Sequence, residues 1–140
     1  MPTTFMDSKS RTWNISINLG VCKKIKTQLD LDFLSADESS NPLLKLASDY
    51  LLLADVLWIL VEPQAIAQNV TVDDFIESLS GDSIDAAVNA LAEAYCFFVP
   101  NPKRREILQR LWVKVRDAES KILAEAEKQV EAVTFPTPGP

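Results

Sequence analysis

The chain consists of segments whose apolar residues recur at a helical spacing, separated by short breaks rich in proline, glycine or asparagine. The most apolar segment runs from Leu43 to Val61 and leaves almost no polar face, which is typical of a helix buried on most sides. Lys45, Asp49 and Asp55 interrupt it, so it lacks the ~20 clean apolar residues that a membrane span needs. We therefore expect a central helix that begins at Asn41-Pro42, an N-cap followed by a proline at the first helical position.

Near the N-terminus the pattern has a period of two instead. Trp13, Ile15 and Ile17 alternate with polar residues in segment 11–18, which is typical of a half-buried strand. A polar turn at 7–10 precedes this segment, so we predict a β-hairpin within residues 1–18. A two-stranded hairpin is only marginally stable alone. We expect it to rest on the helices, and the alternative is that its edge pairs with another chain.

Four further segments have helical periodicity, and they lie at residues 21–31, 72–79, 82–99 and 102–133. Pro63 predicts a kink or break near residues 61–62. Thr71 is the expected cap of the second segment and Gly81 its left-handed end. The predicted fold is mainly α with a minor β part: an N-terminal hairpin packed on a bundle of about five helices, with a long C-terminal helix. Residues 1–133 are expected to form a single domain, and the proline-rich residues 134–140 a disordered tail.

The last predicted helix changes character along its length. Its first half carries bulky apolar residues, namely Ile107, Leu108, Leu111, Trp112 and Val115. Its second half has a thinner stripe among many charges, namely Ala118, Ile122, Ala126 and Val130. We expect the first half to pack on the domain and the second half to project, where the weak stripe either frays or pairs with a partner helix.

Charge and composition argue against several classes of protein. The net charge of −6 and the sequence pI of about 4.6 disfavour a general nucleic-acid binder. The chain has no histidine and no glycine-rich phosphate loop. We therefore expect a protein that is not an enzyme and binds no cofactor, metal, nucleic acid or membrane. The segment MPTTFMDSKS lacks the apolar core of a signal peptide, which predicts a cytoplasmic protein. Cys22 and Cys96 are expected to be buried free thiols rather than a disulfide.

Two charged groups leave alternatives open. Asp55 and Glu62 share a helical face and can bind a cation, but a pairing of Asp55 with a basic residue in the core is the favoured interpretation. Lys103, Arg104 and Arg105 lie in the first turn of a helix, where the dipole disfavours cations. They form either a solvated or internally paired cluster, or a docking patch for an acidic partner.

Four segments resemble the tail assembly chaperones of long-tailed bacteriophages and prophages. They are the opening D-x-x-x-R-T-W-N-I-S-I-N-L-G-V (Asp7 to Val21, continuing to Lys26), A-D-V-L-W-I-L-V-E-P-Q-A (Ala54 to Ala65), D-D-F-I-E-S-L-S-G-D-S-I-D-A-A (Asp73 to Ala87) and F-F-V-P-N-P-K-R-R (Phe97 to Arg105). The resemblance covers roughly Phe5 to Lys114. It lies in the order of these segments along the chain and in their residues, rather than in a catalytic motif.

The resemblance implies a small helical protein of the host bacterial cytoplasm that is absent from the mature virion. Such a protein binds the tape-measure protein and helps to recruit tail tube subunits, and it can also form homo-oligomers. The surfaces expected to contact a partner are the hairpin edge with Trp13, the basic turn, and a face of the last helix. Their residues are Trp13, Lys103, Arg104, Arg105, Trp112, Ile122 and Val130. The alternatives are a head–tail connector or other virion component, and a bacterial helical adaptor.

Overall fold

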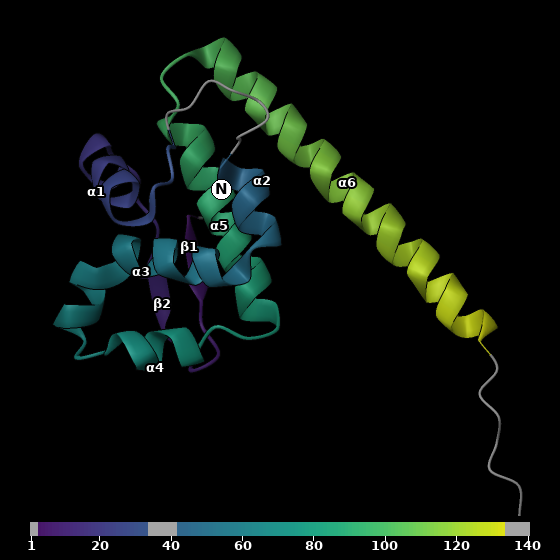
Figure 1. Ribbon diagram of the computed structural model, residues 1–140, viewed down its shortest axis with the longest axis horizontal. Helices are drawn as coiled ribbons and strands as arrows, with labels where there is room; N and C mark the ends of the chain where they lie inside the picture. The colour runs from purple at the N-terminus through teal and green to yellow at the C-terminus, as the bar shows by residue number, and fades with distance from the viewer. Residues whose placement is uncertain (1–2, 34–41, 134–140) are drawn as a thin grey trace, which may run out of the picture. The chain divides into compact units, whose positions relative to one another are not determined.

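The structure of the protein, a computed structural model, describes residues 3–33 and 42–133 (Figure 1). Our expectations for the cap at Asn41, for the loop before it and for the tail at 134–140 lie outside these residues. Within them are β1 (Thr4–Met6), β2 (Thr12–Asn14), α1 (Leu19–Leu29), α2 (Pro42–Ser48), α3 (Tyr50–Ala67), α4 (Val72–Glu77), α5 (Asp82–Phe98) and α6 (Pro102–Ala132). The prediction of a mainly α fold with a minor N-terminal hairpin is confirmed.

Contacts divide the chain into two compact units, residues 1–99 and residues 100–140. The first contains the hairpin and α1 to α5, and α6 belongs to the second. The single domain that we expect over residues 1–133 stays a prediction, as does packing of the first half of α6 on that domain.

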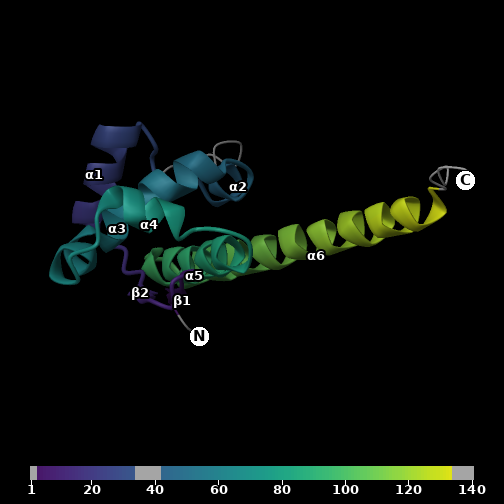
Figure 2. The same ribbon diagram turned by 90° about the horizontal axis from the view of Figure 1, so that it is seen from below.

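Helix α3 is the centre of the first unit, because it contacts α1, α2, α4, α5 and strand β2. In Figures 1 and 2, α1 and α2 lie toward opposite ends of α3. Val56, Leu57 and Val61 of α3 are fully buried. By length and apolar content α3 is the one helix in the described part of the chain that could cross a membrane, although 44% of it is buried within the fold. A core helix meets the same criteria, so this is weak evidence for a membrane span.

The apolar segment that we expect to form one central helix is divided in two at Asp49. This residue has an extended backbone (φ −122°, ψ 91°), and its side chain accepts a hydrogen bond of 3.1 Å from the Leu52 N–H. An aspartate in this position satisfies one of the free N–H groups at the start of a helix. Asp49 therefore ends the α2 segment and caps α3, which accounts for a sixth helix.

Of the kink or break that Pro63 predicts near residues 61–62, the break is wrong, and the kink stays a prediction. Helix α3 continues through Pro63 and ends at Ala67. Asn69, just beyond this end, has a positive φ (57°). A proline removes one helical hydrogen bond, but Val61 and Ala65 on either side of Pro63 are fully buried. Their packing holds the helix together across the missing bond.

Gly81 has a different role from the one expected. Helix α4 ends at Glu77 with Ser78 as its C-cap, and Gly81 is the residue that precedes α5. Its backbone angles (φ 54°, ψ −123°) are accessible to glycine and strained for other residues. A side chain at this position would meet no atom within 4 Å, so conformation alone requires glycine here.

Replacing Gly81 by alanine is expected to lower the free energy of unfolding by about 1–3 kcal/mol because of this backbone strain. Chemical denaturation measures the change. Asp82→Ala, one residue further on at an exposed position of α5, serves as the control and is expected to cost a few tenths of a kcal/mol through the helix dipole. Equal effects of the two substitutions would contradict the assigned role of Gly81.

Helix α5 packs through its small residues. Ala87, Ala90 and Ala92 are buried, and strand β1 lies against this helix. Of the larger residues, Tyr95 is buried and its hydroxyl donates a hydrogen bond of 2.9 Å to the carbonyl of Phe33. Small side chains on this helix allow the hairpin and the helix to approach closely.

Candidate interaction surfaces

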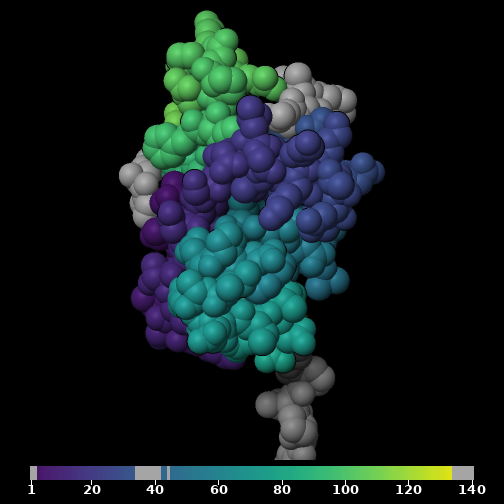
Figure 3. All heavy atoms as spheres, turned by 90° about the vertical axis from the view of Figure 1, so that its left-hand side faces the viewer, coloured from purple at the N-terminus to yellow at the C-terminus, as the bar shows by residue number. Residues whose placement is uncertain are grey.

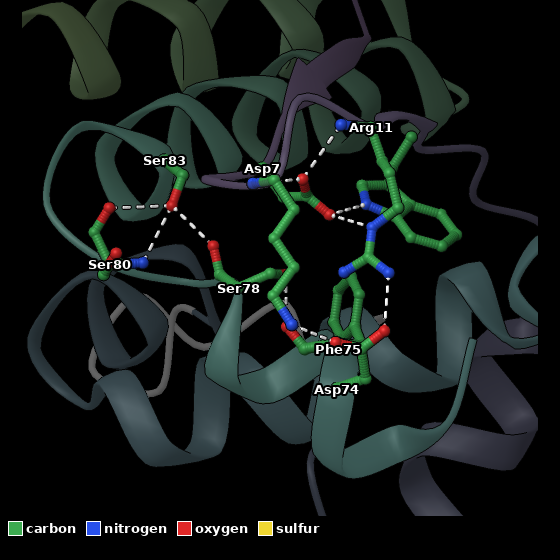
Figure 4. Close-up of polar contacts among 9 residues, drawn as sticks. Asp7, Arg11, Asp74, Phe75, Ser78, Ser80 and Ser83 are labelled. Atoms are coloured by element: carbon green, nitrogen blue, oxygen red, sulfur yellow. Dashed lines mark hydrogen bonds and ion pairs between the residues drawn. The ribbon is translucent and has the colours of Figure 1, made fainter.

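A buried carboxylate organises the turn of the hairpin (Figure 4). The side chain of Asp7 has no exposed surface. It accepts hydrogen bonds from the indole Nε1–H of Trp13 (2.8 Å), from Arg11 Nε (2.8 Å) and from the backbone N–H groups of Lys9 and Arg11 (both 2.9 Å). These bonds close the turn over residues 7–11 and fix the indole ring in the core.

Arg11 joins this turn to helix α4. Its Nη1 donates to Asp74 Oδ2 at 2.7 Å, and Lys9 also pairs with Asp74. The guanidinium lies 5.7 Å from the centre of the Trp13 ring, within the range of a cation–π contact. Two acids and two bases thereby connect strands near the N-terminus to a helix more than sixty residues later.

The electrostatics of this cluster suit a structural role. Burial by itself raises the pKa of Asp7, but the hydrogen bonds from Trp13 and from the turn outweigh it, so that the pKa lies below its ordinary value of 3.8. Hydrogen bonds from Lys9 and Arg11 likewise lower the pKa of Asp74. A general acid or base works best with a pKa near the working pH. Both carboxylates remain ionised at neutral pH, and the cluster holds the hairpin on α4.

A group of serines fixes the turn between α4 and α5 (Figure 4). The Ser83 hydroxyl accepts a bond of 2.8 Å from the Ser80 N–H and lies 2.8 Å and 3.2 Å from the carbonyls of Ser80 and Ser78. The Ser78 carbonyl also accepts a bond of 2.9 Å from the Ser8 N–H of the hairpin turn. The end of α4 is therefore hydrogen-bonded both to the start of α5 and to the turn of the hairpin.

An apolar groove of about 170 Å³ lies between α3, the end of α4 and the start of α5. Its lining residues are Tyr50, Leu51, Leu53, Ala54, Leu57, Ile76, Leu79 and Ile84. Leu51 is 82% exposed and Tyr50 57% exposed. Exposed apolar side chains beside a groove are typical of a surface that binds another protein. We refer to these eight residues as the α3 groove.

The helices that line the α3 groove carry charges of one sign. No lysine, arginine or histidine occurs between Lys45 and Lys103, so α3, α4 and α5 have no cation. Asp49, Asp55 and Glu77 are exposed on or beside these helices. The α3 groove therefore favours an apolar helix flanked by basic residues.

A second depression, of about 270 Å³, lies between β2 and the end of α5. Asn14 and Phe97 are among its lining residues, and Phe97 is exposed. Beside it, Gln64 of α3 bonds the backbone of Asn14 twice, accepting from the N–H (3.0 Å) and donating to the carbonyl (2.7 Å). The outer edge of β2 is thus already occupied at Asn14.

Trp13 is buried and therefore cannot contact a partner. Its side chain has no exposed surface and packs edge-on against Phe75, with ring centres 5.2 Å apart. The hairpin rests on the helices, as we favour from the sequence, and its apolar face is therefore covered. Trp13 is a core residue, and its assignment to a partner surface is corrected.

The other six predicted contact residues are all on α6 but are spread along most of its length, from Lys103 to Val130. Asn101 caps this helix by accepting from the N–H groups of Lys103 and Arg104. Lys103 and Arg104 are exposed, Arg105 and Trp112 are half-buried, and Ile122 and Val130 are exposed. None of the side chains of α6, all of whose residues are described, is buried.

Two further predictions about ionisable side chains have clear outcomes. Asp55 is exposed on α3, so the expected pairing inside the core is wrong. Among the described residues no cluster of acids, cysteines and histidines has the arrangement of a metal site. Cys22 and Cys96 are both buried and free, which confirms that prediction. Burial raises the pKa of both thiols, that of Cys96 to about 11, so neither is a reactive thiolate at neutral pH.

Comparison of the chain with protein-family models, with curated proteins and with solved structures finds no match.

Proposed function

We propose that this protein is a non-catalytic tail assembly chaperone of a long-tailed bacteriophage or prophage. In this role it binds the helical tape-measure protein in the host cytoplasm, helps to recruit tail tube subunits, and is left out of the mature virion. The proposal combines the sequence resemblance with the α3 groove. The resemblance supplies the identity of the client, and the groove supplies a surface on which a client helix can bind.

The residues that carry the resemblance have defined places in the fold. Asp7, Arg11 and Trp13 of the opening segment form the buried cluster, and Asn101-Pro102 starts α6. The second and third segments include Leu57, Ile76 and Ile84, which line the α3 groove. The resemblance therefore extends over both the scaffold and the surface to which we assign the client.

The observation that carries the proposal is the exposure of Leu51 and Tyr50 beside an apolar groove whose helices carry acids and no cation. In helix-in-groove recognition, an amphipathic helix inserts apolar side chains spaced by three or four residues. Basic residues flanking those side chains would complement the acids of α3, α4 and α5. We therefore expect the bound segment of the tape-measure protein to be a basic amphipathic helix.

Co-expression with a candidate tape-measure protein tests the proposal. We expect the tape-measure protein to be insoluble alone and soluble in a complex, with light scattering giving the stoichiometry. Failure to bind, together with recovery of this protein in purified phage particles, would instead identify a head–tail connector.

Leu51→Glu is expected to weaken client binding at least about tenfold, because it places a charge in the apolar contact and adds to an acidic surface. Leu51 is so exposed that the fold should be unaffected, which circular dichroism checks. Ile66→Glu is the matched control, since Ile66 is 67% exposed on the same helix and does not line the groove. Titration calorimetry with a soluble peptide that carries the basic amphipathic helix of the client compares the two variants. Equal affinities would exclude the α3 groove as the client site.

A further inference from the structure

Helix α6 has an apolar stripe along nearly its whole length. Residues on this stripe recur every three or four positions and are Leu108, Leu111, Val115, Ala118, Ile122, Ala126 and Val130. From Leu108 to Val130 the stripe measures about 33 Å at 1.5 Å per residue. Ile122 is 68% exposed and Val130 65% exposed. A helix gains most of its stability by packing such a face, so the stripe calls for a partner helix.

The two halves of α6 carry opposite charge. Residues 102–116 contain six cations and one anion, a net charge of +5, and residues 117–132 contain two cations and five anions, a net charge of −3. Two such helices side by side repel each other when parallel. When antiparallel, each basic half lies against an acidic half, which is attractive.

The helix dipole strengthens this preference. The first turn of α6 contains no acid and the last turn no base, although acids at the N-terminus and bases at the C-terminus stabilise a helix. In an isolated α6, neither end thus has side-chain charges that offset the helix dipole. In an antiparallel pair, the positive end of each helix lies beside the negative end of the other, so dipoles and side-chain charges are both compensated.

Side-chain size favours the same arrangement. The stripe is bulky in the first half, with Leu108, Leu111 and the adjacent Trp112, and small at Ala118 and Ala126 in the second half. Well-packed contacts set large residues against small ones. An antiparallel pair with full overlap sets Leu108 against Ala126 and Val115 near Ala118, although Leu111 then meets Ile122 and Leu123. A parallel pair sets the bulky residues against each other and the alanines against each other along the whole stripe.

We propose that two copies of this chain associate through α6 as an antiparallel helix pair, with the basic half of each helix against the acidic half of the other. Trp112, Ile122 and Val130 then contact the second copy, and the α3 groove is left for the client. Charge, dipole and size along α6 carry this inference, so it stands or falls independently of the proposed function.

Charge reversal in the full-length chain tests the association. We expect sedimentation equilibrium of the unmodified protein to show a dimer at low salt that weakens as salt is added. Arg104→Glu/Arg105→Glu is expected to raise the dissociation constant at least about tenfold, because the new acids at these positions then lie against the acids of the other copy. Adding Glu127→Lys/Glu131→Lys to the same chain places lysines beside the new acids of the other copy and should restore the dimer.

The first pair of substitutions puts acids in the first turn of α6, where the dipole favours them. Loss of the dimer therefore cannot come from loss of the helix, and circular dichroism should show unchanged helicity. Lys23→Glu/Lys24→Glu on the exposed side of α1 changes the net charge equally and should leave the dimer intact. A monomer in the unmodified protein, or a dimer insensitive to reversal in α6, would overturn the proposal. So would a dimer that Leu51→Glu dissociates, because the contact would then lie at the α3 groove.

Cysteine cross-linking tests the orientation. Full overlap of two antiparallel α6 helices places residues 108 and 126 opposite each other. A mixture of the Leu108→Cys and Ala126→Cys variants should cross-link, and each variant alone should not. Cross-linking of each variant with itself would show a parallel pair and overturn the proposal. The unmodified protein gives the background, since Cys22 and Cys96 are buried.

Discussion

Replacing Asp7 by alanine is expected to lower the free energy of unfolding by about 3–5 kcal/mol, the usual effect of removing one partner from a buried ion pair. The substitution deletes the acceptor of four hydrogen bonds. It leaves the buried indole N–H of Trp13 without an acceptor, and it leaves the half-buried Arg11 paired with Asp74 alone. Because small domains are stable by only about 5–15 kcal/mol, urea denaturation should show a much lower midpoint.

Asp73→Ala is the matched control for this experiment. Asp73 is an exposed acid in the first turn of α4, next to Asp74. Its removal should cost a few tenths of a kcal/mol through the helix dipole. If Asp7→Ala and Asp73→Ala lower the stability equally, the buried cluster does not hold the hairpin.

The same carboxylate predicts how stability responds to acid. The pKa of Asp7 is lower in the folded chain than its ordinary value of 3.8, so the folded state favours the ionised form. This stabilisation is complete at pH values above about 5 and is lost as the pH falls through the lowered pKa. The stability difference between the unmodified protein and Asp7→Asn should therefore shrink below pH 3.8. A difference that grows on acidification would contradict this sign.

Phe75→Ala is the second substitution with a large expected effect, about 3–5 kcal/mol of unfolding free energy. The ring is fully buried and lies between two tryptophans, with centres 5.2 Å from Trp13 and 5.8 Å from Trp58. Its removal leaves a cavity where the hairpin, α3 and α4 meet. Thermal denaturation and the change in tryptophan fluorescence would both report it.

Phe97→Ala removes the same atoms from a surface position, since Phe97 is exposed near the end of α5. We expect this variant to stay within about 0.5 kcal/mol of the unmodified protein, as is usual for surface substitutions. The comparison separates the effect of the cavity left by Phe75 from any general effect of losing a phenylalanine. A similar loss in both variants would show that the packing of Phe75 between Trp13 and Trp58 does not account for the effect.

Local signals in the sequence predict several parts of the fold correctly. Thr71 caps α4 as expected, because capping depends on residues only two or three positions apart, and Asn101 caps α6 in the same way. The alternation around Trp13 predicts a strand for a similar reason, although β2 proves shorter than the segment 11–18. Asp49 is missed, because the same residue type serves as a polar interruption within a helix and as the cap that starts one.

The features that depend on distant residues could not be predicted from the pattern. The apolar character of α3 on all sides gives no indication that Leu51 is left uncovered, since that depends on where α4 and α5 lie. The partnership of Arg11 with Asp74 joins residues 63 positions apart. The spacing of Asp7 and Arg11 is the one signal that was available, as an acid and a base four residues apart in a turn can pair.

The contact between Gln64 and Asn14 limits how the hairpin can associate with other strands. A sheet polymerises into a fibre only if every molecule offers two open edges, one to join and one to be joined. Here a helix side chain satisfies both backbone groups of Asn14 on the outer edge of β2. Strand addition at Asn14 would therefore have to displace Gln64, which makes this end of the β2 edge a poor template for another strand. A single glutamine takes the place of a third strand at this position.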